Sequence, residues 1–317
     1  MKKLISFILA VCLCTGCAGA EDYIKWVDFT VGYEALNKAL ALDISSHETE
    51  TPLSWIDILA LAATRKGGSV SVQDVKTAAQ ELSKDESPEE LLGNQYRYYR
   101  YYQQAYTAAL GGLVGNYAIR VRNEAGDYEW KAQYGLKAFS PIAAGYWYSH
   151  YDDFGTGRSY GFARKHLGND LLGSMGTPIV AVESGTVEAL GWNQYGGWRI
   201  GIRSNDRKRY YYYAHLKKDK PYVSGLKEGD TVQAGDVIGF MGRTGYSTTE
   251  NVNNIEIVHL HFGLQLVFDE SQKECNSEIW IDVYDIVRLL DRHRSSVQWN
   301  PEKAQWERIY EFRDLDV

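Results

Sequence analysis

The sequence is poor in cysteine. It has 317 residues and four cysteines, and three of these (Cys12, Cys14 and Cys17) lie before Glu21. Only Cys275 remains beyond that segment, so the rest of the chain cannot form an internal disulfide. We therefore expect its stability to depend on packing, or on a bound metal, rather than on covalent cross-links.

Long apolar runs, basic clusters and internal repeats are missing as well. The apolar run over residues 4–13 is too short to span a bilayer as a stable anchor. The formal net charge is −7, and no stretch of Lys and Arg forms a patch large enough to indicate nucleic-acid binding. We expect a globular protein of two domains, or of one domain with a large extension.

The N-terminal segment, residues 1–20, is typical of an export signal peptide. Lys2 and Lys3 precede the apolar run, and Ala18-Gly19-Ala20 is an A-x-A cleavage pattern. Loss of the two lysines takes the formal charge from −7 to −9. An alternative is lipoprotein processing with a lipid anchor at Cys17, although Cys14 stands where a leucine is usual. Both interpretations predict an exported protein, secreted or associated with the cell envelope.

Residues 21–117 predict a helical N-terminal domain. Apolar residues recur at helical spacing from Ile24 to Leu36, and Thr51-Pro52 begins a second helix that Gly67-Gly68 ends. Capping patterns follow at Ser71 and Ser87. A tyrosine-rich segment over residues 94–110 is expected to pack against the next domain. No motif assigns a role, which leaves wall positioning, coverage of an active site, partner binding or simple packing.

The pattern then changes to that of strands. Residues 118–122 and 128–133 alternate around a turn, which predicts a hairpin within a connecting segment over residues 118–160. From residue 178 to 266, short strands separated by Gly-containing turns indicate an antiparallel sandwich or barrel. Residues 281–292 return to helical spacing, and residues 301–317 are expected to form a loose tail. The predicted fold class is therefore α+β.

Histidine is scarce, yet four of the seven histidines fall between residues 166 and 261. His259 and His261 alternate on one predicted strand, so both side chains emerge on the same face. His166 and Asp170 are four residues apart, and both residue types are common zinc ligands. His215 follows the run Tyr210–Tyr213, after Ala214. If the strand continued, alternation would place Tyr211, Tyr213 and His215 on one face. The other three histidines, His47, His150 and His293, lie in polar settings without a pattern.

Taken together, these residues could form a metal site of the catalytic kind. If the fold brings the strands together, three side chains could bind an ion and leave a fourth position open to water, which is the arrangement of catalytic rather than structural zinc. Two further histidines could then transfer protons. The plain alternative for each residue alone is a surface turn or a structural histidine.

Seven short motifs occur in an order that resembles the lysostaphin-type, or M23, zinc metallopeptidases. The resemblance runs from His166 to Phe262 and a little beyond, and we expect the complete domain, with its C-terminal helix, over residues 161–300. The motifs are His166-x-x-x-Asp170, Gly176-Thr177-Pro178-Ile179-Val180-Ala181, Gly185-Thr186-Val187, Tyr213-Ala214-His215-Leu216, Gly229-Asp230-x-Val232-x-x-Gly235, Ile238-Gly239-x-x-Gly242-x-Thr244-Gly245 and His259-Leu260-His261-Phe262.

The resemblance implies a fold, a reaction and a set of roles. It implies antiparallel β-sheets with a groove, one Zn²⁺ ion, and hydrolysis of peptide bonds in the cross-links of bacterial peptidoglycan. It assigns metal binding to His166, Asp170 and His261, and catalysis to His215 and His259. Which of the two catalytic histidines acts as the general base stays open.

The sequence departs from the family in one segment, and two other functions compete. The stretch Thr249 to Val258 is longer than in many members and has Val258 where a proline is common, which predicts a longer loop at one rim of the groove. One alternative is a catalytically silent scaffold or activator with the same fold, although all five positions are filled. The other is a cupin-type metal enzyme, which would need a glutamate where Gln265 and Leu266 stand.

Overall fold

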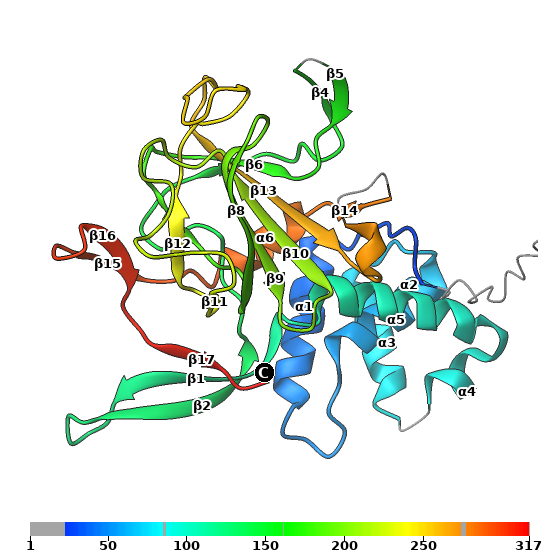
Figure 1. Ribbon diagram of the computed structural model, residues 1–317. Helices are drawn as coiled ribbons and strands as arrows, with labels where there is room; N and C mark the ends of the chain where they lie inside the picture. The colour runs from blue at the N-terminus through cyan, green and yellow to red at the C-terminus, as the bar shows by residue number, and fades with distance from the viewer. Residues whose placement is uncertain (1–22, 85–86, 161, 274–276, 317) are drawn as a thin grey trace, which may run out of the picture.

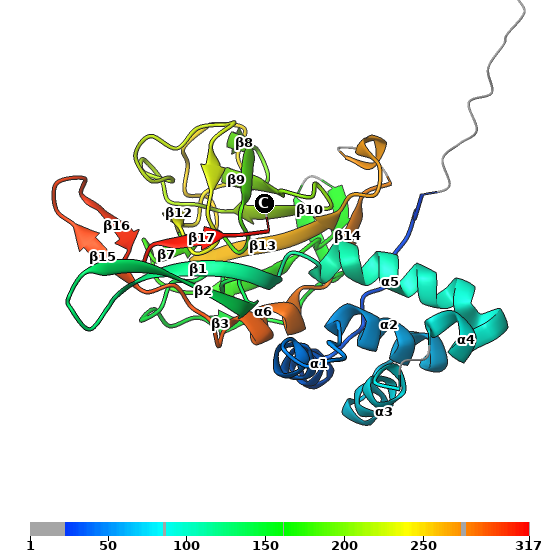
Figure 2. The same ribbon diagram turned by 90° about the horizontal axis from the view of Figure 1, so that it is seen from below.

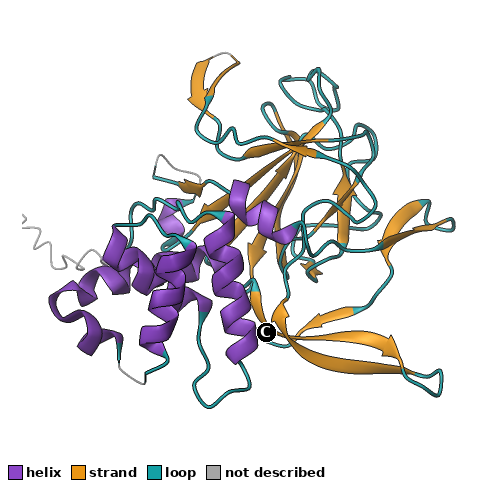
Figure 3. Cartoon of the chain, turned by 180° about the vertical axis from the view of Figure 1, so that it is seen from behind, coloured by secondary structure: helices purple, strands orange, loops and turns teal. Residues whose placement is uncertain are grey.

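The computed structural model describes residues 23–84, 87–160, 162–273 and 277–316. Helices gather on one side of the molecule and strands on the other, so the fold class is α+β as predicted (Figures 1 and 3). The predicted signal peptide over residues 1–20, with Cys17, and the single later cysteine Cys275 lie outside these described residues. Within the described ranges, no helix combines the length and the apolar character that crossing a membrane requires.

The N-terminal helices form one module, and their ends follow local sequence signals. Ser71 and Asp74 form the predicted capping box, and Ser87 forms a second one with Glu90. Gly67 ends its helix in the left-handed region, at a φ of 68° that favours glycine. The helices are α1 (Tyr33–Ser46), α2 (Trp55–Lys66), α3 (Val72–Leu82), α4 (Pro88–Leu92), the 3-10 turn η1 (Gly93–Gln95) and α5 (Tyr96–Leu110).

The prediction of a helix from Ile24 onward is wrong. Residues 23–32 are extended, and α1 begins only at Tyr33. Val27, Phe29 and Val31 are buried at alternate positions, which is the period of an extended segment. Because a spacing of four residues fits both a helix and a strand, Val27 and Val31 could not distinguish the two patterns.

The tyrosines of α5 pack mainly within the helical module rather than against the next domain. Tyr99 is buried and its hydroxyl donates to Asp57 of α2, 2.8 Å away. Tyr106 is buried edge-on against Phe29, with ring centroids 5.6 Å apart. Tyr98 is 48% exposed. The expectation that this segment packs against the next domain is therefore wrong for these side chains.

The strand region is organised around one antiparallel sheet. Its order is β11-β8-β9-β10-β13-β6-β3, and β14 pairs with the far end of β13. These strands are β3 (Ser149–His150), β6 (Asn169–Leu172), β8 (Gly185–Asn193), β9 (Gly197–Ser204), β10 (Arg209–Ala214), β11 (Thr231–Val232), β13 (His259–Leu266) and β14 (Ile279–Ile281). Shorter pairs flank it: β4 (Gly157–Tyr160) with β5 (Phe162–Lys165), β7 (Pro178–Val180) with β12 (Val237–Phe240), and β15 (Val297–Asn300) with β16 (Gln305–Arg308).

The two faces of this sheet have different roles. Tyr211, Tyr213 and Phe262 are buried in the core on one face. The alternate residues Tyr210 and Tyr212 line a groove on the other face.

The predicted C-terminal helix is present as α6 (Tyr284–Leu290), which contacts α1 and so connects the two modules; Figure 2 shows it between α1 and the strands. The short 3-10 turn η2 (Glu270–Gln272) follows β13.

The last residues do not form the loose tail predicted over residues 301–317. Besides β15 and β16, the strand β17 (Phe312–Asp314) pairs with β1 (Val114–Arg122), which forms the predicted hairpin with β2 (Tyr128–Leu136). Phe312 is buried, and Lys137 binds the carboxylates of Asp314 and Asp316 at 2.7 and 2.9 Å. The local sequence is short and charged, and its partner strand β1 lies far earlier in the chain.

A buried charge network joins the helical module to the sheet. Arg209, on β10, is 1% exposed and donates to both carboxylate oxygens of Glu183, at 2.7 and 3.1 Å. Its other terminal nitrogen donates to the carbonyl oxygens of Thr107 and Ala108, 3.0 Å away at the end of α5. A Cβ at Gly112 would lie 1.7 Å from Glu183 Oε1, so only glycine permits this approach. The positions of the two modules are therefore fixed by a network that is buried between them.

Candidate active site

Strand pairing places the first two candidate ligands opposite each other. His261 on β13 pairs directly with Asp170 on β6. His166 approaches from the loop between β5 and β6, which runs close over β13 at Gly168. A Cβ on Gly168 would lie 2.6 Å from the carbonyl oxygen of Phe262 and 2.8 Å from Cε1 of His261. The glycine between His166 and Asp170 therefore lets this loop lie against the strand that carries His261.

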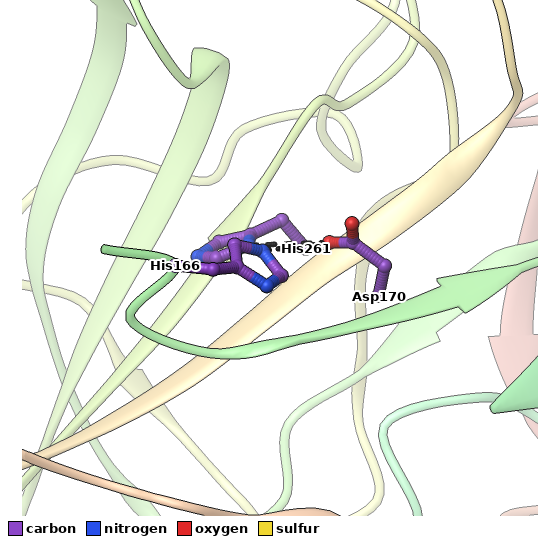
Figure 4. Close-up of side chains that lie close together, drawn as sticks. All are labelled: His166, Asp170 and His261. Carbon is purple, nitrogen blue, oxygen red and sulfur yellow. Dashed lines mark hydrogen bonds and ion pairs between the residues drawn. The ribbon is translucent and has the colours of Figure 1, made fainter. Parts of the chain in front are cut away.

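The ligand atoms of these three residues converge on one point (Figure 4). His166 Nε2 lies 2.7 Å from His261 Nδ1 and 3.1 Å from Asp170 Oδ1, and the latter two atoms are 3.3 Å apart. Ligand atoms about 2.0–2.1 Å from a tetrahedral ion lie about 3.3 Å from one another. The two imidazole nitrogens and the carboxylate oxygen therefore have the separation and the chemistry to bind a single metal ion.

Two residues outside the motifs, Asp153 and Arg158, contact the candidate ligands His166 and Asp170. Asp153 lies 3.2 Å from His166 Nδ1 through both its carboxylate and its carbonyl oxygen, and its Oδ1 accepts the backbone N–H of Asp170 at 3.2 Å. Arg158 donates to Asp170 Oδ2 at 3.2 Å and also binds the carboxylate of Asp153. A carboxylate on the second nitrogen of a ligating histidine fixes its tautomer and its orientation. Asp153 and Arg158 are thus positioning residues.

His215 and His259 lie beside the three ligand residues. Their ring centroids are 4.8 Å apart, and that of His215 is 5.9 Å from the centroid of His261. In each ring, Nδ1 is 2.9 Å from a backbone carbonyl oxygen, that of Thr244 for His215 and that of Ile257 for His259. Because a carbonyl only accepts, Nδ1 carries the proton in both rings. The Nε2 atom of a neutral ring is then free to accept a proton.

The parity argument for His215 is wrong, although the residue reaches the site. Tyr211 and Tyr213 point into the core, whereas His215 turns back toward the groove because its φ is 63°, just after the end of β10. Alternation applies only while the chain stays extended. The expected common face of His259 and His261 is present, since both lie near Asp170, at 3.7 and 3.3 Å.

The electrostatics of the site divide its histidines into two groups. Burial lowers the pKa of His215 well below its ordinary value, and burial also lowers the pKa of His261. Burial acts on His166 in the same direction, but its contacts with Asp153 and Asp170 outweigh it and raise the pKa to about 9. The hydrogen bonds from His166 and His261 hold the pKa of Asp170 below its usual range, against the effect of burial. Without a metal, His166 therefore carries a proton that an ion would have to displace.

The five residues lie in a groove of about 500 Å³. Aromatic and basic side chains line it, including Arg164, Tyr195, Arg199, Tyr212, Tyr246 and Trp280. Within the described ranges, no residue before Arg158 lines this groove, so the helical module does not cover it. The polar loop Thr249 to Val258 does not line it either. Its Asn254 donates a hydrogen bond to the carbonyl oxygen of Tyr246, 2.6 Å away, and so contacts the backbone of a residue that does line the groove.

Sequence reasoning missed Asp153 and Arg158. Both precede the first motif, and acidic and basic residues are common in this segment, so spacing offered no signal. Tyr212 was noted only as part of a strand, yet its ring lies edge-on to His261, with centroids 5.8 Å apart. The alternation of β10 could have placed Tyr210 and Tyr212 opposite the core.

Comparison with known proteins identifies the domain that carries the site. Residues 164–274 match the family described as peptidase family M23. An L-Ala--D-Glu endopeptidase of Bacillus subtilis is 38% identical over 117 residues, which are 37% of this chain and 34% of that protein. The catalytic domain of the antimicrobial peptidase lysostaphin from Staphylococcus simulans is 36% identical, with 39% of this chain and 85% of that chain covered and a TM-score of 0.32.

A further solved structure matches over more of the chain. A lytM protein of Ruminococcus gnavus, a candidate glycyl-glycine endopeptidase, is 25% identical; the match covers 83% of this chain and 98% of that one, with a TM-score of 0.43. The chain spans about a third or less of the length of the curated relatives that it matches. The matched segment contains His166, Asp170, His215, His259 and His261, and through it the chain belongs to peptidase family M23.

Proposed function

We propose that the protein is a zinc-dependent endopeptidase that hydrolyses peptide bonds in the cross-links of bacterial peptidoglycan. One observation carries the proposal: His166 Nε2, Asp170 Oδ1 and His261 Nδ1 lie within 3.3 Å of one another in a groove that also holds two further histidines. The names of the relatives, an L-Ala--D-Glu endopeptidase and lysostaphin, support a peptidase of the cell wall.

The donor set fits zinc and leaves room for a substrate. Two imidazole nitrogens and one carboxylate oxygen are ligands that Zn²⁺ prefers, and three protein ligands leave a fourth position free. When bound, zinc would supply a water of lowered pKa, about 7, and would polarise the scissile carbonyl group. Asp153 keeps His166 oriented, and Arg158 occupies the second oxygen of Asp170, so the carboxylate presents a single oxygen to the ion.

His215 and His259 would handle the proton that hydrolysis moves. The attacking water must lose a proton, and the leaving amine must gain one. Both rings hold Nδ1–H against a backbone carbonyl, so each presents Nε2 for this transfer. A positioned acid–base group of this kind contributes roughly 10²–10⁴ in rate. To stabilise the charge that develops on the scissile carbonyl oxygen, the other ring must carry a proton on Nε2, because only an N–H group can donate to that oxygen.

We infer that the enzyme acts outside the cytoplasm. The N-terminal sequence supports export, either with cleavage after Ala20 or with a lipid on Cys17, and the proposed substrate lies outside the cell. Mass spectrometry of the N-terminal peptide from the native host would distinguish the two. An N-terminus at Glu21 supports cleavage, whereas an acylated Cys17 supports the lipoprotein, and an intact Met1 would contradict export.

Digestion of purified peptidoglycan tests the function directly. The zinc-loaded full chain should release soluble peptide fragments, and their masses should identify the bond that is cut. A chelator should stop the release, and added Zn²⁺ should restore it. Should the chain bind zinc, release nothing and instead increase the activity of another wall hydrolase, it would be an activator with this fold and not an enzyme.

A further inference from the structure

Two arginines that line the groove have no ionic partner among the described residues. Neither Arg164, on β5, nor Arg199, on β9, forms an ion pair within the described ranges, although both face the groove. One nitrogen of each guanidinium group is buried without a hydrogen-bond acceptor: NH1 of Arg164 and Nε of Arg199. A buried, unpaired cationic donor is costly, so these positions indicate an anionic ligand that is not part of the chain.

Arg164 is held at the groove by aromatic rings. Its guanidinium carbon lies 5.0 Å from the ring centroid of Tyr195 and 5.2 Å from that of Tyr246, which are cation–π contacts. Tyr246 in turn lies edge-on to His215, with centroids 5.9 Å apart. These contacts fix the side chain without neutralising its charge, and they place it one ring away from a proposed catalytic histidine.

Arg199 is placed similarly, beside another tyrosine of the groove. Gly201 of β9 pairs with Tyr212 of β10, and Arg199, two residues from Gly201 on the same strand, emerges on the same face as Tyr212 and lines the groove with it. Tyr212 lies edge-on to His261, 5.8 Å between centroids. The hydroxyl of Tyr222 donates to the carbonyl oxygen of Arg199, 2.9 Å away, which holds the strand at this point. Each arginine is therefore separated from the site histidines by one tyrosine.

Two other basic residues of the groove, Arg158 and Lys273, differ from this pair. Arg158 is paired with Asp153 and Asp170, and Lys273 is paired with Glu188. Among the described residues that line the groove, Arg164, Arg199 and the exposed Lys165 form no ion pair, and of these only the two arginines have a buried nitrogen without an acceptor.

We propose that Arg164 and Arg199 form a subsite that binds a free carboxylate of the substrate peptide. The inference rests on the proposed function and deepens it. A guanidinium group binds a carboxylate through charge-assisted, often bidentate hydrogen bonds. The preferred substrate is therefore a stem peptide with an acidic residue beside the scissile bond. A glycine bridge offers no side-chain carboxylate and would leave both guanidinium groups unpaired.

Two synthetic stem peptides test the proposal with the zinc-loaded full chain. They have one sequence, and the acidic residue beside the scissile bond carries a free carboxylate in one and a primary amide in the other. We expect kcat/KM to be at least about tenfold higher for the carboxylate peptide. Equal kcat/KM values, or faster hydrolysis of a glycine-bridged peptide than of the acidic one, would overturn the subsite.

Substitution of the arginines links that preference to the groove. Arg164→Gln and Arg199→Gln should each lower kcat/KM for the carboxylate peptide by about tenfold or more and leave the value for the amide peptide unchanged. Arg100→Gln, on the exposed surface of α5, is the matched control and should change neither value. Equal losses on both peptides would mean that the arginines serve the fold or the metal site, and the proposal would be wrong. The zinc content of each variant should equal that of the wild type.

Failure of the proposed function can be separated from failure of the subsite. If the holoenzyme hydrolyses no peptide, titration calorimetry with the same two peptides still measures the subsite. Tighter binding of the carboxylate peptide, lost in Arg164→Gln and Arg199→Gln, would support the subsite even though the endopeptidase proposal had failed. Equal binding of the two peptides would overturn it.

Discussion

His261 and Asp170 are cross-strand partners of β13 and β6, and their ligand atoms lie 3.3 Å apart. A slip of one residue in this pairing would turn one of the two side chains to the opposite face of the sheet. The register that builds the core on one face therefore also brings two of the candidate metal ligands together on the other. Two of the three candidate ligands are thus brought together as soon as the two strands pair.

Asp170→Ala should remove the metal together with the activity. The substitution deletes one of three ligand atoms and leaves His166 and His261 with no carboxylate between them. We expect the zinc stoichiometry, measured by elemental analysis after dialysis, to fall from about one ion per chain to near zero, with hydrolysis lost. The control Glu89→Ala, on exposed α4, should keep both. Zinc bound at full stoichiometry in Asp170→Ala would contradict the assigned ligand.

His215→Asn should separate catalysis from metal binding. Asparagine tolerates the positive φ of this position, and its amide N–H can replace Nδ1–H as a donor to Thr244 O, but it cannot accept a proton as imidazole does. We expect kcat to fall by roughly 10²–10⁴. Zinc content and thermal stability should stay near the wild-type values. A variant with full turnover would exclude His215 from the proton transfer.

Asp153→Asn should weaken the metal site without removing a ligand. The amide cannot provide the negative charge that now faces His166 Nδ1. Loss of such an outer contact typically costs about 10–100-fold in metal affinity, which competition with a chelator measures. Asp152→Asn is the matched control, because Asp152 is the exposed neighbour in sequence. Equal affinity in Asp153→Asn and wild type would show that Asp153 does not position His166.

Arg209→Met should destabilise the whole chain. It leaves the carboxylate of Glu183 buried without its partner and two carbonyl groups at the end of α5 without a donor. Breaking a buried ion pair on one side costs about 3–5 kcal/mol, measured as the free energy of unfolding in urea. Arg207→Met, at a position whose side chain is 64% exposed, should cost less than about 1 kcal/mol. Similar losses in both variants would argue against the network.

His150 should make the stability depend on pH. Its two ring nitrogens are buried and have no partner among the described residues, and burial lowers its pKa to about 4 although the charge of Asp153 opposes this. The unfolded chain has a pKa of about 6.5 at this residue, so it binds more protons than the folded chain between these values. The stability that neutral His150 permits is complete above pH 6.5 and is lost as the pH falls toward 4, by up to about 3 kcal/mol.

The variant His150→Phe isolates this contribution. Phenylalanine keeps the ring packing against Tyr284, where the centroids are 4.5 Å apart, and has no nitrogen to protonate. Urea unfolding at several pH values should give curves for wild type and variant that separate below pH 6.5, with the variant the more stable at pH 5. Parallel curves over this range would mean that His150 is protonated equally in both states.

Local sequence signals predicted much of the helical module. Contacts between segments far apart in the sequence were harder to predict. Ser71 with Asp74 marked a helix start because the cap needs only residues within one turn. The extended segment over residues 23–32 was mistaken for a helix because its buried positions fit two periods. The strand β17 was missed because nothing in its short, charged sequence shows that a partner exists on β1.

For the site, the spacing of the histidines indicated only that a metal site was possible, and family resemblance supplied the ligand set and the roles. His166 and Asp170 are near each other in sequence, but His261 is 91 residues beyond Asp170 and meets it only through strand pairing. The family resemblance predicted this contact, because the order of the motifs along the chain identifies the fold that pairs the two strands. It gave no access to Asp153 and Arg158, which precede the motifs, nor to the turn that directs His215 into the groove.

The hairpin of β4 and β5 carries two arginines with different tasks. Arg158 and Arg164 are cross-strand partners in this hairpin. Arg158 donates to the candidate metal ligand Asp170, and Arg164 faces the tyrosines of the groove. The hairpin forms its own small sheet and projects from the body (Figure 1). Grafting this arm onto another member of the family would therefore transplant support for the ion and preference for charge at the same time. To change only the preference for a charged substrate, residues of β5 would be substituted and β4 left intact, and the reverse holds for the support of Asp170.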